Sequence, residues 1–183
     1  PLGYFILQGG VNFSGNQADG LNATLIAGRD ATVGITSAIA DLNSGNGVDI
    51  QMEADGDSFA LFSEVDANDN TENGIRLALD GAGGTANAWF EYVQSTQNTG
   101  DGIAIEGNFT GAVEIGGERI VSANNTENGI RLALSGLGGM PVVDFGGGLL
   151  GSTGQNSIYG NSVDMHYNDV GGATVMAQHN WWG

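Results

Sequence analysis

The chain has 183 residues, a length typical of one domain, so we take residues 1–183 as a single unit. It carries 21 aspartates and glutamates against four arginines and no lysine, which gives a net charge of −17. Such an acidic surface keeps an extended protein soluble or attracts divalent cations, and it excludes nucleic acid and anionic membranes as partners. Without cysteine there are no disulfides, and no apolar run reaches the ~18 residues of a membrane helix.

Residues 1–19 resemble part of a repeat unit, with a short apolar strand at residues 4–7 and a Gly–Gly turn. The segment has no basic n-region, so it is not typical of a signal peptide. A start within a repeat unit indicates a fragment of a longer protein. We therefore expect Tyr4, Phe5 and Ile6 to contact a preceding domain or another copy of the chain.

A repeat of about 27 residues organises the chain from Gly20 onward. The sequence TENGIRLAL occurs at residues 71–79 and again at 126–134. The glycine of this motif recurs with spacings of 27, 27, 28 and 27 residues, at Gly20, Gly47, Gly74, Gly102 and Gly129. After each glycine, large apolar residues alternate with small or polar ones, which is typical of a strand with one buried face. We expect the copies to stack as a parallel sheet, with Ile75, Ile103 and Ile130 in one buried column.

Each unit contains two further strand candidates and an Asn-rich turn. The second strands lie at 33–35, 59–62, 88–93 and 111–115, and the third strands end near residues 39, 65, 93 and 121. In the unit of residues 74–101 we expect the second and third strands to run together. Asparagines in register predict amide ladders at the turns.

Three strands per period predict an all-β fold, a three-sided parallel β-helix of about six coils of roughly 27 residues. A leucine-rich-repeat horseshoe is disfavoured because its consensus is absent and no unit contains a plausible helix. A propeller blade needs four strands and a longer period. Calcium rolls are disfavoured because GNGVDI at 45–50 matches their pattern only once.

The period breaks after Gly138, and two segments there carry a resemblance. VVDFGGGLLGSTGQNSIYGN at 142–161 and ATVMAQHNWWG at 173–183 resemble the closing coils of secreted bacterial β-helix domains of the pectin-lyase-like superfamily. The DxGGGxxGSxGxN pattern and the terminal NWWG are the specific parts. The resemblance implies a right-handed helix, an extracellular or cell-surface location, and a module within a larger protein.

That superfamily contains both polysaccharide-degrading enzymes and adhesin stalks, so candidate sites decide between them. The resemblance implies that lyases of this superfamily use calcium-binding aspartates and a basic residue that abstracts a proton. Arg76 and Arg131 are expected in one outward column about 10 Å apart, with Ala104 between them and Asp49 beside Arg76. The alternative is an exposed cross-strand pair. Hydrolases are implied to use an Asp cluster, whereas the outward carboxylates here are expected in different columns: Asp49, Glu53, Asp80, Glu106 and Glu114.

Oxygen-rich turns make Asp66, Asp69 and Asp101 candidate ligands for Ca²⁺, the one cofactor that the sequence suggests; ordinary turn chemistry is the alternative. His166 and His179 near Asp164 and Asp169 are weighed as a metal or acid/base site against solvated neighbours on a strand. The remaining candidates are aromatic. Trp89 and Tyr92 are candidates for stacking on a sugar, and Trp181 and Trp182 for covering or contacting the end of the solenoid.

No groove of convergent charged and aromatic residues emerges from the sequence. We therefore expect a structural or adhesive, rod-like module, secreted or displayed at the cell surface, that associates end to end with other domains or copies into filaments. The alternative is a carbohydrate-binding or polysaccharide-degrading β-helix, which leaves enzymatic activity open. Ice binding is disfavoured because threonines are scattered rather than arrayed on one face.

Overall fold

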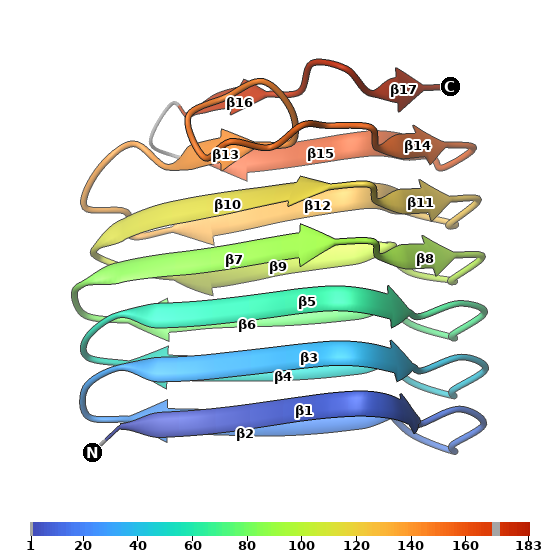
Figure 1. Cartoon of the computed structure of the whole chain (residues 1–183), viewed down its shortest axis with the longest axis horizontal. Coiled ribbons are helices and arrows are strands. Elements are labelled where there is room, and N and C mark those ends of the chain that lie inside the picture. The colour runs from blue at the N-terminus through green and yellow to red at the C-terminus, as the bar shows by residue number, and fades with distance from the viewer. Residues whose placement is uncertain (1, 170–172) are drawn as a thin grey trace.

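The structure, a computed structural model, describes residues 2–169 and 173–183. These residues form a parallel β-solenoid of about seven turns, each stacked on the one before it (Figure 1). The spacing of the turns is roughly the predicted 27 residues. The described part contains strands and turns but no helix, hence no helix that could cross a membrane.

Two parallel sheets enclose the core. Sheet B has one strand per turn: β2 (Leu21–Ala27), β4 (Val48–Ala54), β6 (Ile75–Gly81), β9 (Ile103–Asn108), β12 (Asn128–Ser135) and β15 (Val163–Asp169). Sheet A has eleven strands: β1 (Gly3–Asn12), β3 (Ala31–Ile39), β5 (Ser58–Asp66), β7 (Thr85–Glu91), β8 (Gln94–Thr96), β10 (Ala112–Glu118), β11 (Val121–Ala123), β13 (Val142–Asp144), β14 (Ser157–Tyr159), β16 (Thr174–Met176) and β17 (Trp181–Trp182).

The predicted register of sheet B is confirmed. Ile75 pairs with Ile103, and Ile103 pairs with Ile130, and all three side chains are buried. Facing them across the core, the rings of Phe62 and Phe90 stack with centroids 4.9 Å apart and nearly parallel planes. This separation matches the strand spacing, so the same type of residue in successive turns packs as a continuous column.

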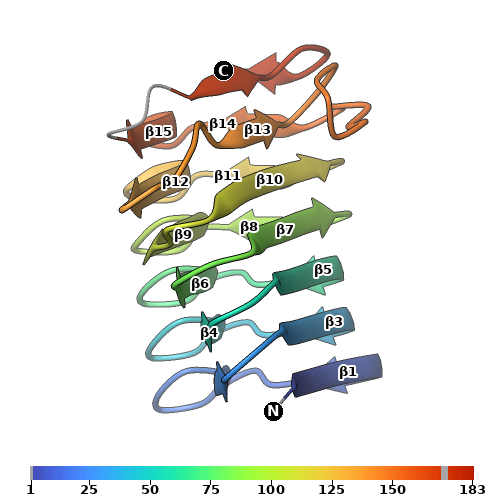
Figure 2. The same ribbon diagram turned by 90° about the vertical axis from the view of Figure 1, so that its left-hand side faces the viewer.

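The second and third strands of each turn lie in the same sheet, on either side of a bend (Figure 2). A residue with left-handed backbone angles forms the bend, for example Glu64 (φ 55°) within β5 and Tyr92 (φ 53°) between β7 and β8. The expectation that the two strands run together in residues 74–101 is wrong, because they are continuous in β3 and β5 and separate from β7 onward. Beside the break the ladder is weak, since Tyr92 N–H donates to Glu118 O at 3.3 Å.

The predicted amide ladder is confirmed at the turn that leads into sheet B. Each of the first five asparagines donates its backbone N–H and its Nδ2 to Oδ1 of the asparagine one turn on, at 2.9–3.1 Å. The six residues are Asn16, Asn43, Asn70, Asn98, Asn125 and Asn161. Four of them are buried, and the ladder supplies the partners that buried amides require.

The DxGGGxxGSxGxN segment forms a loop closed around one buried carboxylate. Asp144, at the end of β13, accepts hydrogen bonds from the backbone N–H groups of Gly146, Gly148, Leu150 and Ser152 at 2.9–3.3 Å. Burial alone would raise the pKa of Asp144, but these four bonds outweigh it and lower the pKa. The aspartate therefore fixes a glycine-rich loop that has little packing of its own.

Candidate functional site

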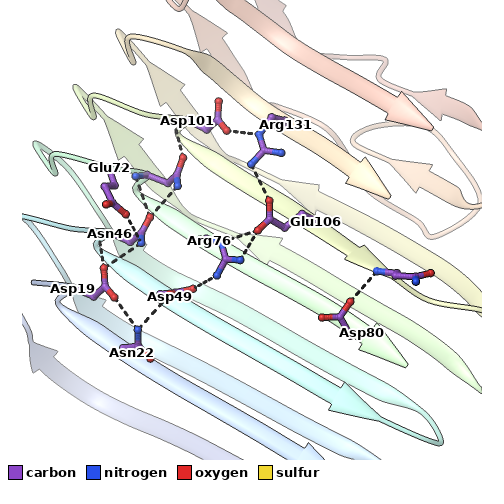
Figure 3. Close-up of polar contacts among 12 residues, drawn as sticks. Asp19, Asn22, Asn46, Asp49, Glu72, Arg76, Asp80, Asp101, Glu106 and Arg131 are labelled. Atoms are coloured by element: carbon purple, nitrogen blue, oxygen red, sulfur yellow. Dashed lines mark hydrogen bonds and ion pairs between the residues drawn. The ribbon is translucent and has the colours of Figure 1, made fainter. Parts of the chain in front are cut away.

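A group of charged side chains lies on the outer face of sheet B and at the N-terminal ends of its strands (Figure 3). Arg76 and Arg131 stand in one column with Ala104 between them, as predicted. Glu106, two residues along from Ala104, reaches between the arginines and binds both. Its Oε1 accepts from Nε of Arg76 at 2.7 Å, and its Oε2 accepts from Nη2 of Arg131 at 3.1 Å.

Two further carboxylates complete the chain of ion pairs. Nη1 of Arg76 lies 2.8 Å from Oδ1 of Asp49, and Nε of Arg131 lies 2.5 Å from Oδ2 of Asp101. Burial alone would lower the pKa of each arginine, but its bonds to the two flanking carboxylates outweigh this and raise the pKa. Both guanidinium groups therefore stay protonated and neutralised, which disfavours either as the base of a lyase.

The network explains why TENGIRLAL occurs in alternate turns. Both copies supply an arginine, and the turn between them supplies the complement, with small Ala104 leaving room and Glu106 providing two carboxylate oxygens. An arginine at position 104 would place three like charges in adjacent rows of one column, which is destabilising. With Asp49 in β4, four consecutive turns thus form one electrostatic unit.

A second ladder runs beside the network at the start of sheet B. Here each residue donates its backbone N–H to Oδ1 of the residue one turn back, at 2.7–3.1 Å, opposite in direction to the first ladder. Its members are Asp19, Asn46, Asn73, Asp101 and Asn128. Asp101 is almost fully buried in this row. Its Oδ1 accepts from Asn128 and its Oδ2 from Arg131, so the arginine satisfies the oxygen that an amide nitrogen replaces in the three asparagines of this row.

Shallow acidic depressions lie between successive turns at this edge. One, of about 390 Å³, is lined by Asp19, Asp49, Glu72 and Arg76, and a second of similar size by Glu72, Asp101, Glu127 and Arg131. Burial alone would raise the pKa of Asp19, but hydrogen bonds from Asn22 and Asn46 outweigh this and lower it. Asp19, Asp49, Glu72 and Asp101 already accept hydrogen bonds from the chain's own donors.

The predicted calcium ligands do not form one cluster. Asp101 belongs to the ladder and the ion-pair network, Asp69 is exposed at a left-handed turn position, and Asp66 ends β5. Burial, together with the charge of Asp41, raises the pKa of Asp66. Within residues 2–169 and 173–183, no group of three or more His, Asp or Glu side chains is arranged to hold a metal ion. Calcium binding at these residues stays a prediction.

The expected scatter of outward carboxylates is wrong for one pair. Glu53 and Asp80 are register partners in adjacent turns, since both lie six residues after the glycine of their repeat. The two histidines are apart in structure: His166 lies in β15 opposite Arg131, whereas His179 precedes β17 and uses its carbonyl to accept from Gln155 N–H. The acid/base reading of the segment 164–169 includes the Asp169 side chain, which lies outside what the structure describes.

Trp89 and Tyr92 lie in different environments. Trp89 points outward from β7, half-buried, while Tyr92 is at the bend, half-exposed, with the guanidinium carbon of Arg119 4.9 Å from its ring centroid. Arg119 therefore occupies one face of the Tyr92 ring. The two aromatic residues do not form a joint platform.

The predicted end residues do lie at the ends of the stack. In β1, Tyr4 and Ile6 are exposed and Phe5 packs partly against the core. In β17, Trp181 and Trp182 are 55% and 38% exposed, and Trp181 packs edge-on against Tyr159 with centroids 4.7 Å apart.

Comparisons of the chain with protein-family models, with curated proteins and with solved structures find no match.

Proposed function

We propose that the chain is a rod-like structural or adhesive module, a right-handed β-solenoid of a secreted or cell-surface protein that stacks end to end on further coils. The right-handed sense is supported by a general rule: a connection between two parallel strands of one sheet is almost always right-handed. Further coils come from the same longer polypeptide or from a second copy. The resemblance of residues 142–183 to closing coils supports the location.

One observation carries the proposal. Among the described strands, β1 pairs only with β3, and β2 pairs only with β4, so both present an unpaired edge at the same end of the rod. The inward side chains there remain half-exposed: Phe5, Leu7, Leu21, Ala23 and Leu25. An open edge with an apolar cross-section behind it is a template for pairing with another strand. The −17 charge opposes side-by-side clumping and leaves the ends as the natural contacts.

The experiment blocks the edge without touching the core. Gly3 N–H donates toward the β3 side, so by the alternation of a strand Gln8 N–H points to the open edge. Gln8→Pro removes that donor, as prolines at edge strands do, and Gln8→Thr keeps it. We expect light scattering after size exclusion to show concentration-dependent multimers for the protein and Gln8→Thr, but fewer for Gln8→Pro. A strict monomer at high salt and high concentration, or multimers unaffected by Gln8→Pro, would contradict stacking of this chain through β1.

A further inference from the structure

The outer face of sheet A, the sheet whose strands β1, β3, β5, β7 and β10 lie in front in Figure 1, carries several apolar side chains. The strands β1, β3, β5, β7 and β10 pair in register, and every second side chain points outward. The two central outward columns hold Tyr4, Thr32, Phe59, Asn87 and Glu114, and Ile6, Gly34, Leu61, Trp89 and Gly116. Glu114 is the single charged residue among these ten. We call Tyr4, Ile6, Phe59, Leu61 and Trp89 the apolar strip.

Glycines in the central columns flatten the apolar strip. Cδ1 of Ile6 lies 3.2 Å from where a Cβ on Gly34 would be, and the indole of Trp89 occupies the space that a Cβ on Gly116 would need. Each side chain thus lies over the next turn instead of standing away from the sheet. Phe59, Leu61 and Trp89 line an open hollow of about 250 Å³ together with Leu150, which belongs to the loop that Asp144 fixes.

Acidic residues border the apolar strip on both sides. On one side, Asp30 directly precedes β3 and Asp57 directly precedes β5, each two residues before the first central column. The outward position after the central columns is Glu91 in β7 and Glu118 in β10, which are register partners. The nearest cations are fewer: Arg29 precedes Asp30, and Arg119 lies 3.8 Å from Glu118. An apolar centre with a charged rim is the usual anatomy of a protein interface.

The charge of the rims selects the kind of partner. A second copy would bring the same acidic rims against one another, and the chain has no lysine to oppose them, while Arg76 and Arg131 are already paired on sheet B. A complementary partner therefore carries apolar residues in the centre and basic residues on both flanks. Exposed apolar side chains gathered on one face and bordered by charged residues indicate an interaction site.

The direction of the apolar strip selects the partner's conformation. It runs from β1 to β7, four neighbouring strands spaced ~4.8 Å apart, so it extends about 14 Å along the solenoid axis, perpendicular to the strands. A partner lying along it finds no parallel strand edge for backbone pairing. An α-helix satisfies its own backbone, is about 10–12 Å wide, and covers 14 Å with about 10 residues. We propose that the apolar strip docks a basic amphipathic α-helix of a partner protein, held by an apolar face and flanking lysines or arginines.

This docking site is lateral, so it does not depend on the end-to-end contacts of the proposed function. Gln8→Pro, which blocks the end, is expected to leave helix binding unchanged. Conversely, changes to the apolar strip at Phe59 and Leu61 are expected to leave the multimers seen by light scattering unchanged. The failure of either proposal is thus visible separately.

The probe is a labelled peptide of about 16 residues with leucines at i, i+3, i+4 and i+7 and lysines on both flanks of the apolar face. One control peptide has glutamate in place of each lysine, and a second has the same composition with the apolar face scrambled. Fluorescence anisotropy measures binding to the whole chain at low and high salt. We expect the basic helix to bind, both controls to fail, and binding to weaken as salt rises.

Variants then locate the site. Phe59→Ser combined with Leu61→Ser is expected to weaken binding at least about tenfold, since apolar centres dominate interface energies. Ile26 lies on sheet B and is more exposed than Phe59. Ile26→Ser is therefore the control variant, and we expect it to bind the peptide like the parent. Circular dichroism confirms that each variant is folded. Four results would overturn the proposal. The acidic peptide binds as well as the basic one, or the basic peptide does not bind at low salt. Alternatively, the double variant binds the basic peptide like the parent, or it dissolves a dimer of the chain.

Discussion

Asp144→Asn tests whether one carboxylate holds the loop of residues 145–152. The aspartate uses both oxygens: Oδ1 accepts from Gly146 and Gly148, and Oδ2 accepts from Leu150 and Ser152. Asparagine keeps one oxygen and places an NH₂ group where the second was. Two backbone N–H groups then face a donor, and the two retained bonds lose the carboxylate charge.

The structure gives the size of the effect. A hydrogen bond to a charged group contributes about 1.5–3 kcal/mol, so losing two costs the closed loop about 3–6 kcal/mol. The Asp144 side chain has no exposed surface in the closed loop. At 1.4 kcal/mol per factor of ten, even the lower figure lowers the protection of the loop on the order of a hundredfold. The turns that contain β4, β6 and β9 are distant and are expected to keep their protection.

Native-state hydrogen exchange read out by NMR measures this directly. We expect the amides of Leu150 and Ser152 to exchange much faster in Asp144→Asn than in the parent. The matched control is Asp57→Asn, because the Asp57 side chain accepts from Thr85 N–H at 2.8 Å with one oxygen, and an asparagine oxygen can keep that bond. Unchanged exchange at Leu150 and Ser152 would refute the assignment of Asp144 as the organiser of this loop.

Periodicity alone predicted what depends on the repeat. The buried column through Ile103 and the asparagine ladder both follow from equal offsets after the repeat glycine, since parallel strands in register place equal offsets side by side. The pairing of Glu53 with Asp80 follows from the same offset and could have been found in the same alignment. The handedness rests on resemblance and on general preference and stays a prediction.

The ion-pair network was only half predictable. The column of Arg76 and Arg131 was visible in the sequence, but Glu106 belongs to the neighbouring column, and it reaches the arginines only because long side chains cross diagonally between rows. Backbone bends were also hard to read. Leu42 and Gln97 adopt left-handed angles beside the ladder asparagines, where local propensity favours glycine or asparagine. The buried ladder fixes these positions more strongly than their own propensity.

Ile103→Asp buries an unpaired carboxylate in the central column and is expected to lower the free energy of unfolding by more than about 4 kcal/mol in urea titrations. Ile26→Asp on the exposed face should cost little, and equal effects would mean that the column is misassigned. Asn98→Ala interrupts the buried ladder and should cost about 2–4 kcal/mol. The last prediction concerns pH. Burial alone would raise the pKa of Glu106, but its bonds to Arg131 and Arg76 lower it below the ordinary 4.5. A depressed pKa stabilises the fold above that ordinary value and ceases to do so as pH falls through the folded value. The stability gap between the protein and Glu106→Gln should therefore be full at neutral pH and close in acid, and a gap that stays constant down to strongly acidic pH would show that Glu106 does not bind the arginines as an anion.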